Sequence, residues 1–445
     1  MFEAEVVLKH AGQLLTVPSS AGGGAPDDVG LIEDGALAIA EGRILWVGPT
    51  GELERHVKVT PKTETYHLHG RVVTPGLIDP HTHLVFAGTR EREFAMRAAG
   101  RPYLEILAEG GGILSTVRAT RAASEDELTR LALTRLNRFI AHGVTTVEAK
   151  SGYGLSLEHE LKLLRVAWRL GELHPVRVVR TFLGAHAVPP EFRDRKGDYV
   201  RHLVDELLPA VAAERLAEFC DVFLDEGVFS KDDARRVLER AMELGLRPRM
   251  HAGQFRDLGG PQLAGKLHAV SVDHLEHVSP AGLEAMAAAG VVAVLLPGAA
   301  LSLGMTPPDA RRFTKAGVRV ALSTDLNPGT SMTENLLLMM TLGITQMKLS
   351  PEQALRAVTD HAAAALGRSG QLGTLAIGAE ADVAVFDVGD WRRLSYHFGV
   401  PHAEMVLIEG EVVWTRESIR RVPARRGRKP GRKTGEGTAT GRGAT

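Results

Sequence analysis

Short apolar runs alternate with amphipathic stretches through the middle of the chain. The runs have the length of buried parallel strands, and the stretches between them carry apolar residues at helical spacing. The eight expected strands are Val72–Ile78, Val144–Ala149, Val176–Leu183, Val222–Leu224, Pro248–His251, Val270–Asp273, Val291–Leu295 and Val318–Leu322. The clearest expected helices are Glu125–Ala141, Leu157–Leu170, Lys231–Leu244 and Pro280–Ala289. This order predicts an α/β protein with a (β/α)8 TIM-type barrel. An open doubly wound sheet is the alternative, but no G-x-G-x-x-G sequence follows the first strand.

Both ends of the chain show a different pattern, with short strands separated by turns. The expected strands there are Ala4–Leu8, Ala36–Ala40, Ile44–Val47, Asp382–Phe386 and Met405–Ile408. We therefore expect residues 1–72 and 373–415 to form one composite β-sandwich domain beside a barrel of residues 73–372. Residues 416–445 are rich in Lys, Arg and Gly, a composition that predicts a basic disordered tail.

Composition narrows the class of protein. The formal net charge of the 445 residues is -1, which gives no general electrostatic reason for binding nucleic acid or an acidic membrane. Cys220 is the only cysteine, so an intramolecular disulfide is impossible and a reducing cytoplasm fits. No apolar run approaches the roughly 20 residues of a membrane-spanning helix. These features predict a cytoplasmic protein with no membrane partner.

Candidate metal ligands lie where expected strands end. His81 and His83 follow the first barrel strand, and residues two apart on a strand face the same side. His251 and Asp325 end two further strands, and barrel active sites lie at the carboxyl ends of strands. Three imidazoles and a carboxylate suit Zn²⁺ or Fe²⁺. The alternatives are unrelated surface histidines and, for Asp325, a turn carboxylate. His274 and His186 also follow strands; each is either a core histidine or a proton-transfer group.

Several motifs resemble those of the imidazolonepropionase family, within the amidohydrolase superfamily. The motifs are Asp79–Gly88 (DPHTHLVFAG), Gly110–Arg121 (GGGILSTVRATR), Lys150–Leu155 (KSGYGL), Leu183–His186 (LGAH), Asp273–Glu276 (DHLE) and Ser323–Ser331 (STDLNPGTS). The His-x-His pair is shared across the superfamily, whereas the glycine-rich, Ser-Gly-Tyr-Gly and Asn-Pro-Gly-Thr blocks are more specific. The resemblance covers roughly residues 1–413 and excludes the basic tail.

The resemblance implies hydrolysis of the ring C–N bond of 4-imidazolone-5-propanoate to N-formimidoyl-L-glutamate by a metal-activated water. This reaction is the third step of L-histidine degradation. The implied metal ligands are His81, His83, His251 and Asp325, and the implied cofactor is one zinc or iron ion per subunit. Dinuclear amidohydrolases use a modified lysine on the fourth strand, but Val222–Phe229 contains none. Lys150 ends the second strand, so one metal is favoured.

The resemblance also implies a set of substrate contacts. Arg90 would fork onto the propanoate carboxylate. The other implied contacts are Tyr153, His186, Gln254, Asn327, Gly329 and Thr330. For Arg90 a surface arginine is the alternative, and for the last three residues a tight turn. Glutamine has no titratable proton near neutral pH, so the catalytic base would be Asp325 and the proton shuttle His274.

Two other functions stay open at this stage. A mononuclear metal-dependent deaminase of a heterocyclic ring would share the ligands and the fold, but would release ammonia. A non-catalytic barrel used as a scaffold would bind no metal. The expected partner is a small carboxylate-bearing substrate, and the family implies a homodimer.

Overall fold

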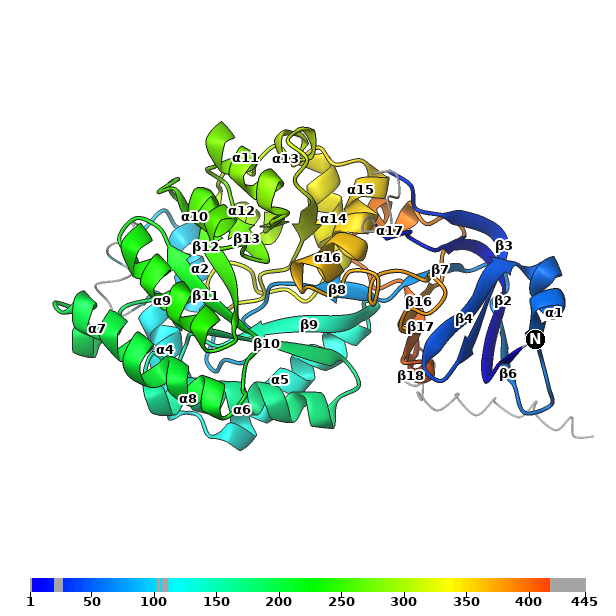
Figure 1. Cartoon of the computed structure of the whole chain (residues 1–445), viewed down its shortest axis with the longest axis horizontal. Helices are drawn as coiled ribbons and strands as arrows, with labels where there is room; N and C mark the ends of the chain where they lie inside the picture. The colour runs from blue at the N-terminus through cyan, green and yellow to red at the C-terminus, as the bar shows by residue number, and fades with distance from the viewer. Residues whose placement is uncertain (1, 20–26, 102–104, 106–110, 417–445) are drawn as a thin grey trace, which may run out of the picture.

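The computed structural model describes residues 2–19, 27–101, 105 and 111–416. The predicted basic tail lies outside the described residues, apart from Arg416. Two parts lie side by side along the long axis of the molecule, a barrel wrapped by helices and a second sheet (Figure 1).

The predicted α/β barrel is confirmed. Its eight parallel strands follow one another in sequence order, and a parallel bridge between Thr82 and Leu326 joins the chain after the first strand to the chain after the last. The strands are β8 (Leu77–Asp79), β9 (Val144–Lys150), β10 (Arg177–Ala185), β11 (Phe219–Leu224), β12 (Arg247–Ala252), β13 (Ser271–His274), β14 (Val292–Leu295) and β15 (Val320–Leu322).

Helices cover the outside of the barrel. Local signals fix several of them: Ser124 caps α5 by accepting from the backbone N–H of Glu127, and Ser230 and Asp233 form a capping box at α9. The main helices are α2 (Glu91–Ala98), α4 (Ile113–Ala122), α5 (Glu125–Ile140), α6 (Leu157–Leu173), α7 (Lys196–His202), α8 (Leu208–Ala213), α9 (Lys231–Glu243), α10 (Gly260–Lys266), α11 (Pro280–Ala289), α12 (Pro297–Leu303), α13 (Arg311–Lys315), α14 (Leu336–Thr345), α15 (Pro351–Ala357) and α16 (Asp360–Ala365).

Both terminal segments contribute to the second sheet, as expected. Its order is β18-β17-β16-β7-β2-β3-β4, with β6 beside β2, so strands from the two ends of the chain meet where β7 pairs with β16. The strands are β2 (Val6–Leu15), β3 (Leu31–Ala40), β4 (Arg43–Pro49), β6 (Glu64–His67), β7 (Val72–Pro75), β16 (Val383–Phe386), β17 (Ala403–Ile408) and β18 (Glu411–Thr415).

The prediction of a single strand over Val72–Ile78 is wrong. Two strands occupy this segment: β7 belongs to the second sheet and β8 opens the barrel. Gly76 lies between them and donates its backbone N–H to Asp382. A Cβ atom at Gly76 would lie 2.3 Å from Thr145 Oγ1, so the chain passes from one sheet to the other where only glycine fits.

The interior of the barrel is polar at the end that carries the site. Residues at alternate positions of β9, β11, β12 and β13 point inward, as the period of two requires. These inward residues are Glu148, Lys150, Asp221, Arg249 and Asp273, and their side chains are fully buried. Their outward neighbours, such as Val147, Met250 and Val272, belong to the main hydrophobic core beneath the helices.

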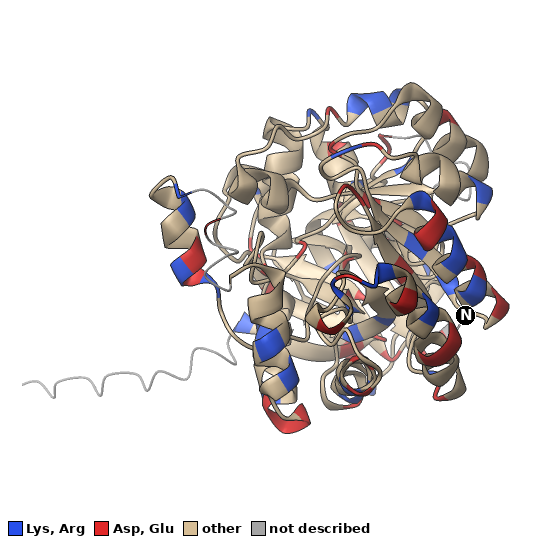
Figure 2. Cartoon of the chain, turned by 90° about the vertical axis from the view of Figure 1, so that its left-hand side faces the viewer, with Lys and Arg blue, Asp and Glu red and all other residues tan. Residues whose placement is uncertain are grey.

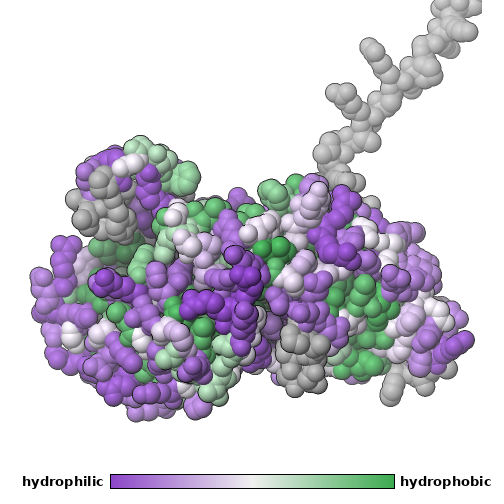
Figure 3. All heavy atoms as spheres, turned by 90° about the horizontal axis from the view of Figure 1, so that it is seen from above, coloured by the Kyte–Doolittle hydropathy of each residue, from purple (hydrophilic) through white to green (hydrophobic). Residues whose placement is uncertain are grey.

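Charges of both signs are interspersed over the face shown in Figure 2. Apolar atoms reach the surface in separate patches among hydrophilic ones (Figure 3). Within the described part of the chain, no helix combines the length and the apolar character needed to span a membrane.

The Gly76→Ala variant tests the crossing between the two sheets. The added methyl group would collide with the stiff, β-branched Thr145, and overpacking of this kind costs about 1–3 kcal/mol of unfolding free energy. Urea unfolding measures the loss. The matched control is Gly171→Ala in α6, where no heavy atom lies within 4 Å of the new Cβ. Equal stability of the two variants would contradict the argument.

Candidate active site

Three histidines meet at the carboxyl end of the barrel. His81 and His83 follow β8, and His251 lies within β12. One ring nitrogen from each lies within 4.8 Å of the others, and all three residues are buried. The His-x-His pair and the histidine of the fifth barrel strand therefore come together as expected.

Asp325 completes this group from the loop after β15. Its Oδ1 lies 3.4 Å from His81 Nε2 and 3.7 Å from His83 Nε2. The residue has a φ of 51°, in the left-handed region that costs a non-glycine residue roughly 1–3 kcal/mol. Such strain persists only where the surroundings over-determine the backbone, and here it brings the carboxylate to the imidazoles.

The group has the unsatisfied atoms that a metal ion requires. Nε2 of His81, Nδ1 of His83 and both ring nitrogens of His251 are buried and have no hydrogen-bond partner in the described part of the chain. Buried polar atoms are nearly always paired, so orphaned imidazole nitrogens that converge on one point indicate a ligand. Three imidazoles and a carboxylate are the donors that Zn²⁺ and Fe²⁺ accept. The residues present therefore fit a metal ion.

A network of buried ions lies directly behind the histidines. Lys150 Nζ contacts Glu148 Oε1 at 2.9 Å, Asp221 Oδ2 at 2.8 Å and Asp273 Oδ2 at 3.3 Å. Arg249 adds a contact of 3.2 Å to Asp273 Oδ2 and donates to the carbonyl oxygen of Pro80. The nearby cations and histidines outweigh the effect of burial and hold the pKa values of Asp221 and Asp273 below their usual range, so both stay ionised.

The network contacts two of the three histidines, through a hydrogen bond to His81 and an ion-pair contact to His251. His81 Nδ1 lies 2.7 Å from Asp273 Oδ2, and His251 Nδ1 lies 3.0 Å from Asp221 Oδ2. A carboxylate at Nδ1 leaves Nε2 free to bind a metal. Burial and Lys150 lower the pKa of His81, but Asp273 outweighs them and raises it to about 9. For His251 burial dominates over Asp221 and lowers the pKa to about 4.

A second group of ligands shares His251. Its other members are Asp221 and Asp273, and their ligand atoms also lie within 4.8 Å of one another. The ammonium group of Lys150 contacts both of these carboxylates, so a cation of the protein already fills this position. The arrangement leaves one group of ligands for a metal.

The other predicted aromatic and imidazole groups surround the three histidines. The His186 ring stacks on His83 with centroids 4.8 Å apart, and the Tyr153 ring lies 5.5 Å from His83. The His274 ring lies 5.4 Å from His251 and 5.8 Å from His81. Burial lowers the pKa of His186 to about 3, so its ring is neutral. Sequence reasoning had assigned all three rings to the site, and they gather there.

A residue missed by the sequence analysis holds the loop of Tyr153. Glu160, in the first turn of α6, is fully buried, and its Oε1 accepts backbone N–H groups of Gly154 and Leu155, both at 2.8 Å. Its carboxylate also accepts the N–H of Gly152 at 3.1–3.2 Å. An acidic residue on the buried face of an amphipathic helix was the available signal.

Arg90 faces the loop after Asp325. Its Nε and Nη2 donate to Glu93 Oε2 at 2.9 and 2.6 Å. Its Nη1 lies beside Gly329, and a Cβ atom added to Gly329 would be 2.3 Å from this Nη1. Arg90, Gly329 and Thr330 line one cavity of about 640 Å³, together with apolar side chains that include Phe94. Three predicted substrate contacts thus share a cavity.

Asn327 and Gln254 have different surroundings. Asn327 Oδ1 accepts the N–H groups of Gly329 and Thr330, both at 2.8 Å, and its Nδ2 donates to the carbonyl oxygen of Asp325. Asn327 therefore shapes the loop in this structure, as the tight-turn alternative describes. Gln254 is buried three residues beyond His251.

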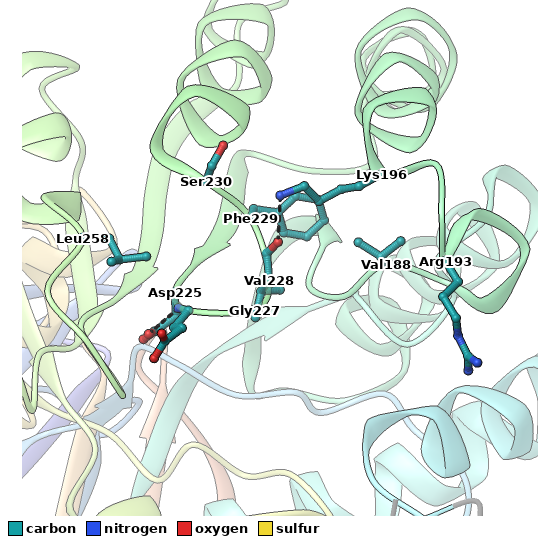
Figure 4. A pocket seen from close by; sticks show the side chains of 10 residues that line it. Val188, Arg193, Lys196, Asp225, Gly227, Val228, Phe229, Ser230 and Leu258 are labelled. Carbon is teal, nitrogen blue, oxygen red and sulfur yellow. Dashed lines mark hydrogen bonds between the residues drawn. The ribbon is translucent and has the colours of Figure 1, made fainter. Parts of the chain in front are cut away.

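A second hollow, of about 550 Å³, opens beside the loop after β11 (Figure 4). Its lining includes Lys196, Asp225 and Phe229, and contains none of the predicted site residues. The Asp225 carboxylate accepts the backbone N–H groups of Phe255 and Arg256 at 2.9 and 3.0 Å, so it fixes a loop.

The ion network itself was missed from the sequence. The expected fourth strand began at Val222, whereas β11 begins at Phe219 and includes Asp221. Glu148 and Lys150 stand two apart on β9, and Arg249 and His251 stand two apart on β12. Polar residues two apart on a barrel strand face the same side, the inside of the barrel. This spacing could have predicted the ion network from the sequence.

Comparisons with known proteins show what this chain is similar to. A model of the amidohydrolase family matches residues 86–414. The chain is 47% identical over 411 residues to the imidazolonepropionase of Shouchella clausii, covering 91% of this chain and 92% of that protein. It is 48% identical to the imidazolonepropionase of Geobacillus kaustophilus, covering 91% and 97%.

Solved structures show the same fold at low identity. An adenosine deaminase from Xanthomonas campestris with bound zinc has a TM-score of 0.69 at 17% identity, covering 92% of this chain and 93% of that one. The guanine deaminase of E. coli has a TM-score of 0.69 at 15% identity, covering 92% and 99%. The fold and the full-length relatives together place this chain in the imidazolonepropionase family of the amidohydrolases.

Proposed function

We propose that the protein hydrolyses the ring C–N bond of 4-imidazolone-5-propanoate to give N-formimidoyl-L-glutamate. One arrangement carries the proposal. Three histidines that can bind a metal lie at the carboxyl end of the barrel beside Asp325, and the loop that follows Asp325 lines a cavity together with Arg90. The relatives at 47% and 48% identity are imidazolonepropionases. The substrate's carboxylate and cyclic amide match the arginine and the metal-ligand group, respectively.

His81, His83, His251 and Asp325 would hold one zinc or iron ion. Such an ion polarises a carbonyl group and lowers the pKa of water to about 7. The buried acids Glu148, Asp221, Asp273 and Asp325 outnumber the buried cations Lys150 and Arg249, and burying uncompensated charge is costly. A metal ion at the imidazoles would supply the positive charge that a proton on His81 supplies without it.

The protein's own groups would move the protons. Asp325 lies beside the imidazoles and would accept a proton from the attacking water. His274 would deliver a proton to the ring nitrogen as the C–N bond breaks. Gln254 has no proton to exchange near neutral pH and would only hydrogen-bond the substrate. Burial of these groups excludes bulk water, which strengthens each electrostatic interaction.

The substrate's side chain would be held away from the metal. Arg90 would bind the carboxylate through the edge of its guanidinium that includes Nη1, because Nε and Nη2 already donate to Glu93. Asn327, Gly329 and Thr330 would place the loop against the same carboxylate, and Tyr153 and His186 would flank the ring. A homodimer is a prediction from the family alone.

The His274→Ala variant tests the proton donor. Loss of general acid catalysis should lower kcat by roughly 100- to 10,000-fold and leave the metal content unchanged. The assay follows loss of 4-imidazolone-5-propanoate together with release of ammonia, which a deaminase would produce and ring opening would not. The control is His277→Ala, an exposed neighbour. Full activity of His274→Ala, or stoichiometric ammonia from the unmodified protein, would refute the proposal.

Arg90→Ala tests the carboxylate clamp. Hydrogen bonds to a charged group contribute about 1.5–3 kcal/mol, so KM should rise roughly 10- to 100-fold with a smaller effect on kcat. Steady-state kinetics measure both constants, and the exposed Arg92→Ala is the matched control. An unchanged KM would show that another group binds the carboxylate.

Asp273→Asn tests the support behind the metal ligands. The amide removes the negative charge at His81 Nδ1, and changes of this kind lower metal affinity by about 10- to 100-fold. Competition with a chelator measures the affinity, and circular dichroism checks that the variant is folded. Asp309→Asn, in an exposed ion pair with Arg311, is the control. A folded Asp273→Asn protein with unchanged affinity would contradict the role of the network.

A further inference from the structure

Glu276 is a buried carboxylate that the mechanism above does not use. Its side chain is 1% exposed, and neither of its oxygens has a hydrogen-bond partner in the described part of the chain. A buried carboxylate without a partner costs several kcal/mol of stability. Glu276 is the last residue of the Asp273–Glu276 motif, so the cost arises at the edge of the active site.

The nearest basic group to this carboxylate is an imidazole. Nδ1 of His274 lies 3.7 Å from Glu276 Oε2, and this nitrogen is also buried and without a partner among the described residues. Two complementary groups thus face each other just beyond hydrogen-bond distance. Such contacts are often long in the absence of substrate and shorten in the reacting complex.

The backbone holds this pair under strain. His274 and Leu275 have φ values of 80° and 65°, in a region that costs non-glycine residues roughly 1–3 kcal/mol each. Backbone bonds tie the turn to the neighbouring strand: the N–H of Leu275 donates to Ala252, and that of His277 donates to Gly253 at 2.7 Å. The Leu275 side chain is fully buried in the main core, which helps to offset the strain.

We propose that Glu276 is a positioning residue for His274, an inference that rests on the proposed proton-transfer role of His274. The carboxylate accepts a hydrogen bond from Nδ1–H and fixes the tautomer and the orientation of the ring. Nε2, at the far edge of the ring, is then the atom that exchanges the proton. Nε2 first accepts the proton that Asp325 has taken from the attacking water, and then passes it to the leaving ring nitrogen. The N–H bond at Nε2 therefore forms and breaks, Nδ1 keeps its proton throughout, no proton passes to Glu276, and Asp325 and His274 return to their starting forms. A carboxylate behind a catalytic histidine serves the same purpose in hydrolytic triads.

Replacing Glu276 should affect activity and thermal stability differently. A residue kept for structure destabilises the fold when it is replaced, whereas an unpaired buried carboxylate is itself a cost. Glu276→Gln keeps the shape and removes the charge. Its midpoint of thermal unfolding should therefore equal or exceed that of the unmodified protein, while its activity falls.

The decisive experiment uses the metal-loaded full-length protein and three variants. Glu276→Gln should lower kcat by about 10- to 100-fold with KM within about twofold. His274→Ala and the double variant should be equally impaired, because Glu276 acts only through His274. The ¹⁵N shifts of the His274 ring should show the Nδ1–H tautomer, and Glu276→Gln should reduce its share. Glu284→Gln, an exposed acid on α11, is the control.

Each contrary result has a separate meaning. Full activity of His274→Ala would remove the proposed role of His274 and this inference with it. Impaired His274→Ala with fully active Glu276→Gln would overturn this inference alone. A Glu276→Gln protein with raised KM and unchanged kcat would mean that Glu276 contacts the substrate. Loss of thermal stability with an unchanged tautomer would assign Glu276 a structural role.

Discussion

The site depends on the buried ion network inside the barrel. Lys150 and Arg249 hold Asp221 and Asp273 ionised at the centre of the strands, and these carboxylates contact the Nδ1 atoms of His251 and His81. Ions are costly to bury unless each is paired, so the network specifies its own geometry closely. The contacts with these carboxylates hold the imidazole rings of His81 and His251 in place. A metal ion would therefore bind Nε2 atoms that are already oriented.

The backbone is strained at the carboxyl end of the barrel, around the ion network. Asp325, His274 and Leu275 all have positive φ values, and all lie where strands end beside the metal ligands. The surrounding core and the interstrand hydrogen bonds hold these conformations. The side chains of Asp325 and His274, which we propose to move protons, are thereby held beside the three histidines, and the large barrel core offsets the cost in stability.

The barrel fold and the meeting of three histidines could be predicted, because each leaves a local pattern in the sequence. Strand–helix alternation predicts the barrel, and histidines at strand ends predict the metal group. The split at Gly76 could not be predicted, because both halves of the segment are apolar and only the packing of Thr145 separates them. Asp221 was missed because the expected strand began at Val222, three residues after the first residue of β11. Glu160 left a local signal, as an acid on the buried face of an amphipathic helix, whereas the role of Glu276 depends on contacts made in three dimensions, which no local pattern encodes.

The central claim is that one metal ion binds His81, His83, His251 and Asp325, while Lys150 fills the neighbouring carboxylate group. Anomalous diffraction from crystals of the purified protein, at the zinc and iron edges, tests it most directly. The account predicts one anomalous peak per chain, bound by Nε2 of His81 and His251, with the Lys150 ammonium still between Asp221 and Asp273. A peak between Asp221 and Asp273, or two peaks in one chain, would contradict it.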